Sequence, residues 1–335
     1  MNNINQYIMV MSGGTEAPLI FGDLQYDARV QYLEKPLKPI YSKWQSLLRS
    51  VHLATRINKY IALPFRSVWD RSLSLSQIDF SAEKNYHIIF INTSIVKYHI
   101  GYLKSLKQKY NVHYYLYMVD SVHTEKGREV AAYLNDKTLF NTIYSFDQND
   151  CQKYGFSYFV QPLSQIRIDA AQHKSDLYFL GRTKGRLPLL LALKEKVGNA
   201  LNLNLKVLPE NEDEKATLLK MNILSDYIPY QQNIQYVLAT NVILELVQKN
   251  QSGNTLRYQE AIMYNKKLLT NNQNVVNMPF YNAQYIQVFD DVEHINVQWL
   301  SEKIAVDYGY NGEFSASRLI DDIEQRYTNN KGKIE

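Results

Sequence analysis

The chain has 335 residues, which exceeds the roughly 100 to 200 residues of one domain and favours two α/β domains. Hydrophobic residues make up 45% of it, yet no apolar run approaches the roughly 18 to 20 residues that a membrane span needs, and residues 1–6 lack the pattern of a secretory signal. A net charge of +4 is too small to indicate nucleic-acid binding, and Cys151 is the sole cysteine, so no internal disulfide can form. These features predict a cytoplasmic protein.

Strand and helix patterns alternate through the first half of the chain, as expected for a parallel sheet covered by helices. We therefore expect one Rossmann-like domain over residues 1–165. Its predicted strands are 7–11, 87–92, 112–119 and 142–146, and its clearest predicted helix is 95–109.

The alternation restarts after a polar stretch at 163–175, where we place the domain boundary. A second Rossmann-like domain is expected over residues 172–312. The C-terminal segment 313–335 contains an amphipathic helix at 315–327, which we expect to cross back to the first domain. The predicted strands of the second half are 177–180, 203–208, 242–247, 267–269 and 286–289, with helices at 187–201 and ending near 263.

A basic turn containing glycines follows the strand 177–180 and opens the next helix. Gly181 lets the backbone approach a phosphate closely, the helix start offers free amides, and Arg182 and Lys184 supply positive charge. The spacing differs from the dinucleotide fingerprint and from the P-loop, which disfavours ordinary dehydrogenases and P-loop NTPases. The alternative interpretation is an ordinary strand-to-helix turn with solvated basic residues.

A second candidate site begins the helix that follows strand 242–247. Good N-cap residues beside a glycine leave helix amides open to an anion. Arg257 and Glu260 lie three apart on one helix face, where the arginine can meet a phosphate and the glutamate can accept both ribose hydroxyls. The alternative is an Arg–Glu pair on the surface. The residues of this candidate site are Ser252, Gly253, Asn254, Thr255, Arg257 and Glu260.

Asp120 and His123 follow the carboxyl end of the apolar strand 112–119, and open parallel sheets bind ligands at that edge. Either side chain can act as a general base on an acceptor hydroxyl or can hydrogen-bond a donor sugar. The alternative is that Asp120 caps a helix and His123 is merely exposed. Gly13 and Gly14, after the first strand, can admit a substrate close to the backbone, or can form only a turn.

The segment 35–71 holds eight basic residues against the single acid Asp70, with aromatic and aliphatic residues interleaved. A basic amphipathic face of this kind can dock on anionic lipid and hold an enzyme against a lipid-linked acceptor. A core helix with a solvated basic face, or a nucleic-acid patch, are the alternatives. The predicted membrane contacts are Lys43, Trp44, Arg49, Arg56 and Lys59, with Leu48 and Trp69 adding apolar burial.

The sequence does not support a metal site. Histidines and Cys151 are scattered without the spacing of metal ligands, and no Asp-x-Asp follows a strand. Asp290 and Asp291 come closest, but they are adjacent rather than alternate, and we interpret them as part of a turn.

Three stretches of the second half resemble the donor-binding domain of GT-B glycosyltransferases, particularly bacterial enzymes of capsule, exopolysaccharide or lipopolysaccharide synthesis. In such enzymes a glycine-bearing loop, a helix that opens toward the phosphates and a glutamate at the ribose precede an apolar strand, and Glu260 matches that glutamate. Residues 265–267 are Asn-Lys-Lys where many members have Gly-Lys-Pro. The three stretches are Asp176–Arg186, Gln251–Ala261 and Asn265–Asn272, and the turn at Ser145–Gly155 is similar to one of the same group.

The resemblance implies a GT-B fold, in which two Rossmann-like domains face each other across a cleft, with a nucleoside-diphosphate sugar bound chiefly by the second domain. Arg182, Lys184, Arg257 and helix amides would stabilise the leaving diphosphate, so neither a metal nor a cofactor is required. A lipid-linked surface glycan would approach from the first domain, near residues 13–14 and 120–123. We therefore expect peripheral contact with the inner face of the cytoplasmic membrane.

Three rival functions remain at this stage. A GT-B-fold sugar-nucleotide epimerase would bind the same donor but would lack a lipid-facing acceptor surface, and the basic segment 35–71 argues against it. A non-catalytic sugar-nucleotide-binding partner of another transferase is the second rival. A nucleic-acid binder would need its basic residues in one groove with aromatics, and no recognition motif accompanies them.

Overall fold

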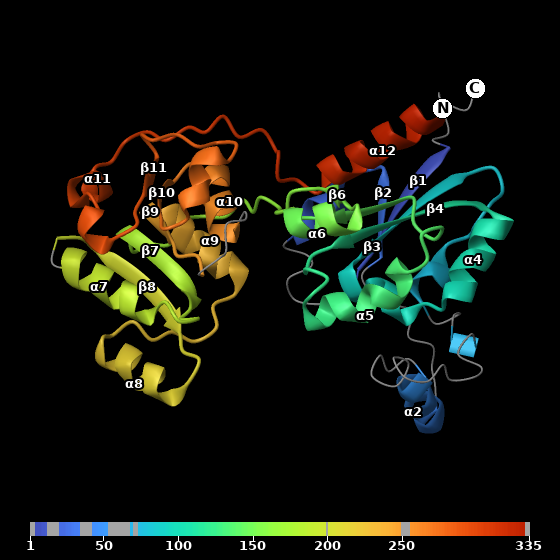
Figure 1. Cartoon of the computed structure of the whole chain (residues 1–335), viewed down its shortest axis with the longest axis horizontal. Helices are drawn as coiled ribbons and strands as arrows, with labels where there is room; N and C mark the ends of the chain where they lie inside the picture. Colours follow the sequence, from blue (N-terminus) through green and yellow to red (C-terminus); the bar gives the residue numbers. More distant parts are fainter. Residues whose placement is uncertain are drawn as a thin grey trace. The chain divides into compact units, whose positions relative to one another are not determined.

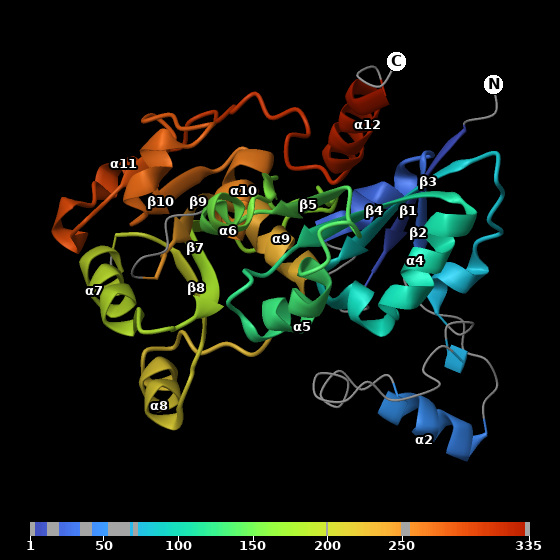
Figure 2. The same ribbon diagram turned by 45° about the vertical axis from the view of Figure 1, so that its right-hand side comes forward.

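The computed structural model divides the chain into two compact units (Figures 1 and 2). Unit 1 comprises Met1–Ser164 and Phe314–Glu335, and unit 2 comprises Gln165–Glu313. The chain therefore passes from unit 1 into unit 2 and returns to unit 1 at its C-terminal end. The residues that the structure describes are 4–11, 20–33, 42–52, 68–69, 73–198, 200–248 and 255–331.

The described part of unit 1 contains a six-stranded sheet in the order β2-β1-β3-β4-β5-β6, and every neighbouring pair is parallel. The strands are β1 (Asn5–Val10), β2 (Val30–Leu33), β3 (Asn85–Ile91), β4 (Asn111–Met118), β5 (Thr142–Ser145) and β6 (Ser157–Tyr158). Parallel strands are covered on both faces, so their sequences are apolar nearly throughout rather than alternating. Strand β3 shows this clearly, because all of its residues are buried.

Helices cover both faces of the unit 1 sheet. They are α4 (Ile100–Lys109), α5 (Glu125–Leu134), α6 (Gln148–Tyr154) and α12 (Ser317–Lys331), with 3₁₀ helices at Gly22–Tyr26, Ser74–Gln77 and Asn92–Lys97. Unit 1 also contains α2 (Lys43–His52), none of whose residues is buried. Helices α4 and α5 pack against one face through Leu103 and Val130. Helix α12 packs against the opposite face through Leu319, Ile320 and Ile323 (Figures 1 and 2). The prediction that the C-terminal helix crosses back to the first domain is confirmed.

Unit 2 contains a second parallel sheet, of five strands in the order β11-β10-β9-β7-β8. The strands are β7 (Ser175–Arg182), β8 (Leu203–Leu208), β9 (Thr240–Glu245), β10 (Lys267–Thr270) and β11 (Ile286–Val288). The helices are α7 (Leu187–Val197), α8 (Glu212–Lys220), α9 (Tyr230–Ala239), α10 (Leu256–Met263) and α11 (Val297–Ser301), with 3₁₀ helices at Gln273–Asn277 and Val292–His294.

Side chains alternate between the two faces of the unit 2 sheet. Val242 and Leu244 of β9 belong to the same apolar cluster as Leu190 and Leu193 of α7. The intervening residue, Ile243, points to the other face, where α9 and α10 pack. The sequence and the structure therefore agree on two Rossmann-like α/β units.

The predicted helix over residues 95–109 is wrong as a single element. The structure has a 3₁₀ helix at Asn92–Lys97, and α4 begins only at Ile100. His99 has an extended backbone between them, with φ −81° and ψ 136°, and its ring accepts a hydrogen bond from the amide of Gly101. An N-cap of this kind ends one helix and starts another, and apolar spacing alone does not reveal it.

We expect the Ile320→Ala substitution in α12 to destabilise unit 1, because the side chain is fully buried against the sheet. Truncations of this kind cost about 2 to 5 kcal/mol. Hydrogen exchange of the β1 and β3 amides should accelerate correspondingly. Gln325→Ala, at an exposed position of the same helix, is the control and should leave exchange unchanged. Equal protection in both variants would show that α12 contributes no stability to unit 1.

Candidate functional site

The strand order of unit 2 reverses direction between β7 and β9. From β7 the chain moves outward to β8, and after returning to β9 it moves the other way to β10 and β11. The crossover helices that leave β7 and β9 therefore lie on opposite faces of the sheet, and their first turns diverge. Open α/β sheets bind ligands at such a point, outside the carboxyl ends of the strands. We call the C-terminal ends of β7 and β9, with the turn at residues 183–186 and the start of α10 at Thr255, the switch edge.

The turn after β7 is tight and presents positive charge. Lys184 and Gly185 have positive φ values of 42° and 74°, and the amide of Arg186 closes the turn onto the carbonyl of Thr183 at 2.8 Å. The backbone amides of Lys184 and Gly185 donate a hydrogen bond to no described residue. Arg182 and Lys184 are exposed, and neither pairs with an acidic side chain of the described part. The predicted phosphate-binding turn therefore has free amides and free cations.

Gly181, also predicted for the donor site, is the penultimate residue of β7 and lies at a crowded position. A Cβ atom there would lie 3.1 Å from the ring of Phe179 and 3.8 Å from the guanidinium of Arg186. The absence of a side chain thus leaves space for the ring of Phe179.

Arg186 has a structural role that the sequence did not reveal. Its guanidinium donates to the carbonyl oxygens of Arg182 at 2.7 Å, of Thr183 at 3.2 Å and of Leu246. Burial lowers the pKa of its guanidinium below the ordinary value. Because Leu246 follows β9, this side chain joins the ends of β7 and β9 and fixes the spacing of the switch edge.

The start of α10 is attached to the end of β9. Thr255 is the N-cap of this helix and accepts a hydrogen bond from the amide of Tyr258 at 3.2 Å, as its position predicted. Its hydroxyl donates to the carboxylate of Glu245, which also accepts from Thr270. Glu245 is the last residue of β9 and is 1% exposed. The sequence analysis did not identify Glu245 as a site residue, although an acidic residue within an otherwise apolar strand sequence could have indicated it.

Arg257 and Glu260 form a buried ion pair, so the alternative of a surface pair is wrong. Glu260 is 0% exposed and the side chain of Arg257 is 19% exposed. Asn233 of α9 donates to Oε1 of Glu260 at 2.9 Å and accepts from Arg257 at 3.1 Å, while Oε2 of Glu260 accepts from Arg257. Burial raises the pKa of the Glu260 carboxyl, and the charge of Arg257 opposes this rise. The other members predicted for this site, Ser252, Gly253 and Asn254, lie outside the described residues.

The unit 1 sheet has its own reversal, between β1 and β3, and Asp120 lies at that edge after β4. Asn92, directly after β3, has a positive φ of 45° and donates to the Asp120 carboxylate at 2.7 Å. Asp120 is half-buried, and it is Thr124 that caps α5, so the alternative of Asp120 as the helix cap is wrong. Asn92 was missed as a partner, although it ends a predicted strand. Gly13 and Gly14 lie outside the described residues.

His123 lies in the same loop as Asp120 but in a different environment. It is exposed, and its ring lies 6.2 Å from that of Tyr154. The loop is fixed by Asp150, whose buried carboxylate accepts from the amide of Val122 at 2.8 Å. No hydrogen bond joins Asp120 to His123 among the described residues, so the two candidates for a base stand separately.

The predicted membrane contacts Lys43, Trp44 and Arg49 all lie on α2, whereas Arg56 and Lys59 lie outside the described residues. Trp69 is 8% exposed and donates a hydrogen bond to His52 at 2.7 Å, so its predicted role at a lipid surface is wrong.

Within the described part of the chain, no group of three or more His, Cys, Asp or Glu side chains is placed to hold a metal ion. No helix of the described residues has the length and apolar character needed to cross a membrane.

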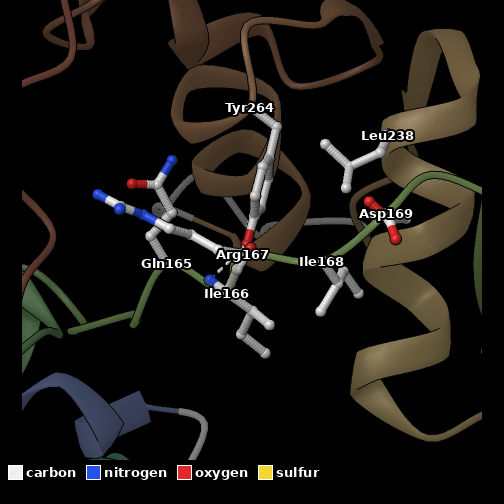
Figure 3. Close-up of a pocket in the computed structure, with 7 residues that line it drawn as sticks. All are labelled: Gln165, Ile166, Arg167, Ile168, Asp169, Leu238 and Tyr264. Atoms are coloured by element: carbon white, nitrogen blue, oxygen red, sulfur yellow. Dashed lines mark hydrogen bonds between the residues drawn. The ribbon is translucent and has the colours of Figure 1, made fainter.

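A cavity of about 540 Å³ lies at the far end of α10 from the switch edge (Figure 3). Tyr264 follows the last residue of α10, and its hydroxyl accepts from the amide of Ile166 at 2.9 Å and donates to the carbonyl of the same residue at 3.3 Å. The cavity is thus next to the segment that enters unit 2 and separate from the predicted donor residues. It is lined by Gln165, Ile166, Arg167, Ile168, Asp169, Leu238 and Tyr264.

Comparison with known proteins identifies the fold of the chain. No family model matches the chain, and no curated protein matches it. Sucrose-phosphate synthase from Thermosynechococcus elongatus matches with a TM-score of 0.53 at 11% identity, over 98% of this chain and 100% of that one. A putative UDP-N-acetylglucosamine 2-epimerase from Listeria monocytogenes has a TM-score of 0.49 at 8% identity, over 98% and 97%. An alpha-glucosyltransferase in complex with UDP-glucose and DNA has 0.49 at 12%, over 83% and 82%.

The likeness to the first of these structures, together with the two parallel sheets, shows that the chain has the GT-B fold predicted from its sequence. At this identity the likeness establishes the fold and not the reaction.

The buried Glu245 should make the stability of unit 2 depend on pH. Burial raises the pKa of its carboxyl above the ordinary 4.5. A group whose pKa is raised in the folded state stabilises the fold fully below its ordinary pKa, and this stabilisation is lost as the pH rises through the folded pKa. Relative to Glu245→Gln, the native chain should therefore lose free energy of unfolding as the pH rises from 4.5 toward 7.

Urea unfolding at each pH measures this difference. With Trp44 and Trp69 replaced by phenylalanine, the fluorescence of Trp299 reports on unit 2. Glu195→Gln, which removes an exposed acid from α7, is the control and should follow the profile of the native chain. Parallel profiles for Glu245→Gln and the native chain would contradict the assignment.

Proposed function

We propose that this chain is a glycosyltransferase that moves a sugar from a nucleoside-diphosphate donor to a hydroxyl group of a lipid-linked surface glycan. The features that support the proposal are the free amides and exposed cations Arg182 and Lys184 in the turn after β7, together with Arg257 in the first turn of α10, in a chain with the GT-B fold. Helix starts and turn amides bind phosphate groups, and arginine binds them through paired N–H groups. A diphosphate is the ligand class that this combination favours.

The proposed reaction needs negative charge to be stabilised on the leaving diphosphate. The bond between the anomeric carbon and the diphosphate oxygen breaks, and the oxygen keeps the electron pair. The acceptor oxygen bonds to the anomeric carbon, and its proton passes to a base, for which Asp120 and His123 are the candidates. Fixed cations and amides at the switch edge stabilise the leaving group without requiring a metal ion.

The transferase is expected to release nucleoside diphosphate only when an acceptor is present. Purified chain is incubated with a panel of nucleoside-diphosphate sugars, with and without lipid-linked glycans extracted from bacterial membranes, and the released nucleotide is quantified. Replacing both Arg182 and Lys184 by alanine should slow the release by on the order of 10². Lys220→Ala, which removes an exposed lysine of α8, is the matched control.

The same assay separates the rival functions. Conversion of the donor sugar without an acceptor would indicate an epimerase, and binding without turnover would indicate a non-catalytic partner. EDTA should leave the rate unchanged. Loss of turnover in EDTA that magnesium or manganese restores would contradict the metal-independent mechanism.

The lipid-linked acceptor is proposed on the basis of α2. The spacing of Trp44, Leu47, Leu48 and Val51 puts them on one side of the helix. They are 76%, 55%, 50% and 38% exposed, and no residue of α2 is buried. We call these four residues the α2 stripe. A group of exposed apolar side chains of this kind marks a binding surface.

Charge favours anionic lipid as the occupant of the α2 stripe. Helix α2 contains Lys43 and Arg49 but no acid. At about 100° per residue, Lys43 borders the stripe, whereas Arg49 lies on the opposite side. The proximity of Arg49 to Lys97 contributes, after burial, to lowering the pKa of that lysine, as expected if Arg49 faces the folded unit. The proposed contact therefore uses the α2 stripe and Lys43, without Arg49.

Vesicle co-sedimentation tests this contact. The chain should bind vesicles that contain anionic phosphatidylglycerol more than vesicles of phosphatidylcholine alone, and less as the salt concentration rises. Replacing Trp44 and Leu48 by serine should lower binding at least about tenfold, because apolar burial is lost. Leu219→Ser, at a position of α8 that is 68% exposed, is the matched control.

Equal recovery with both kinds of vesicle, or none with either, would contradict lipid docking. Dimerisation that the Trp44 and Leu48 changes abolish, measured by analytical ultracentrifugation, would instead identify a second copy of the chain as the occupant.

A further inference from the structure

We infer that Glu260 and Asn233 position Arg257 for diphosphate binding and that Glu260 itself does not contact the donor. This inference rests on the donor site of the proposed function and assigns that site a division of roles. It differs from the sequence-based expectation that Glu260 accepts the ribose hydroxyls.

The hydrogen bonds of Arg257 use only one edge of its guanidinium. Nη1 donates to Oδ1 of Asn233 at 3.1 Å and to Oε2 of Glu260, which accounts for both of its hydrogens. Nε and Nη2 donate to no described residue and retain three N–H groups. The 19% exposure of the side chain shows that part of it is accessible to solvent. An anion can therefore bind the free edge without displacing Glu260.

The two partners of Arg257, Asn233 and Glu260, are fixed by hydrogen bonds that join α9, α10 and β7. Asn233 of α9 is 1% exposed, and Glu260 of α10 is 0% exposed. Nδ2 of Asn233 donates to Oε1 of Glu260 at 2.9 Å, and the hydroxyl of Tyr178 on β7 donates to Oδ1 of Asn233 at 2.9 Å. A buried charge is stable only while it is paired and hydrogen-bonded. The arginine is thus fixed in one orientation before any ligand arrives.

The same contacts leave Glu260 unsuited to a ribose. Both carboxylate oxygens already accept hydrogen bonds from protein donors, and no part of the side chain reaches solvent. Because the carboxylate is fully covered, a ribose hydroxyl could reach it only by displacing Asn233 or Arg257, which would leave a buried polar group without its partner and cost binding free energy. Binding through the free edge of Arg257 avoids this cost.

Binding of pyrophosphate, which has no ribose, tests the division of roles. Isothermal titration calorimetry compares pyrophosphate with UDP and GDP for the native chain and for Glu260→Gln. If Glu260 positions Arg257, the substitution should weaken pyrophosphate and the nucleotides by the same factor, at least about tenfold. If Glu260 holds the ribose, only the nucleotides should weaken.

The sign of the effect is also informative. Removing a negative charge near an anion site should strengthen pyrophosphate binding by electrostatics alone, so a weaker affinity requires that the arginine has lost its orientation. Unchanged or stronger pyrophosphate binding in Glu260→Gln would overturn the inference.

Two further variants keep the test independent of folding. Tyr178→Phe removes only the hydroxyl that holds Asn233, and it should weaken pyrophosphate binding by a smaller factor, with the circular dichroism spectrum unchanged. Glu195→Gln, an exposed charge change on α7, should leave the affinity as in the native chain. Failure of the native chain to bind pyrophosphate would remove the donor site itself, whereas absence of sugar transfer with pyrophosphate binding intact would remove only the proposed reaction.

Discussion

Parallel strands cannot be joined by tight turns, so each connection in this chain must cross a sheet face before the next strand begins. Every pairing between the described strands of the two sheets is parallel, so the carboxyl ends of all strands in one sheet lie on the same edge of that sheet. Where the strand order reverses, successive crossovers leave on opposite faces and their first turns separate. In unit 2 the ends of β7 and β9 lie beside each other at this point, and Arg186 joins them by donating to the carbonyl oxygens of Arg182 and Leu246.

Hydrogen-bond donors around two buried carboxylates explain why unit 2 tolerates charge within its interior. Glu245 and Glu260 are almost completely buried, which is costly unless every oxygen has a donor. Two threonines satisfy Glu245, and Asn233 with Arg257 satisfies Glu260. Each carboxylate links α10 to another element, β9 and β10 in the first case and α9 in the second. Buried charge here fixes the start and orientation of one short helix relative to the sheet.

The sequence predicted nine of the eleven described strands, because buried parallel strands are continuous apolar runs, and the ends of these nine differ from the structure by at most two residues. It missed the short strands β2 and β6. It also predicted the Thr255 cap, which depends on local chemistry. It missed the contacts of Glu245 and Glu260, since Thr270 and Asn233 lie 25 and 27 residues away along the chain. It grouped Trp69 with Trp44 because both belong to one basic segment, although only the fold determines which of them is covered.

The two units carry different surface chemistry, and the proposed reaction requires that difference. Unit 2 has the exposed cations Arg182 and Lys184, which the charged, water-soluble donor of the proposed reaction would require, and its large exposed apolar side chains, such as Leu219, Tyr227 and Val276, lie on separate elements. Unit 1 has an exposed apolar stripe on one helix, together with Asp120 at the end of β4. A lipid-linked acceptor needs an apolar contact and a base, whereas a nucleotide sugar needs neither. We therefore expect membrane contact and proton transfer to belong to unit 1, and changes to the α2 stripe to leave the donor affinity of unit 2 intact.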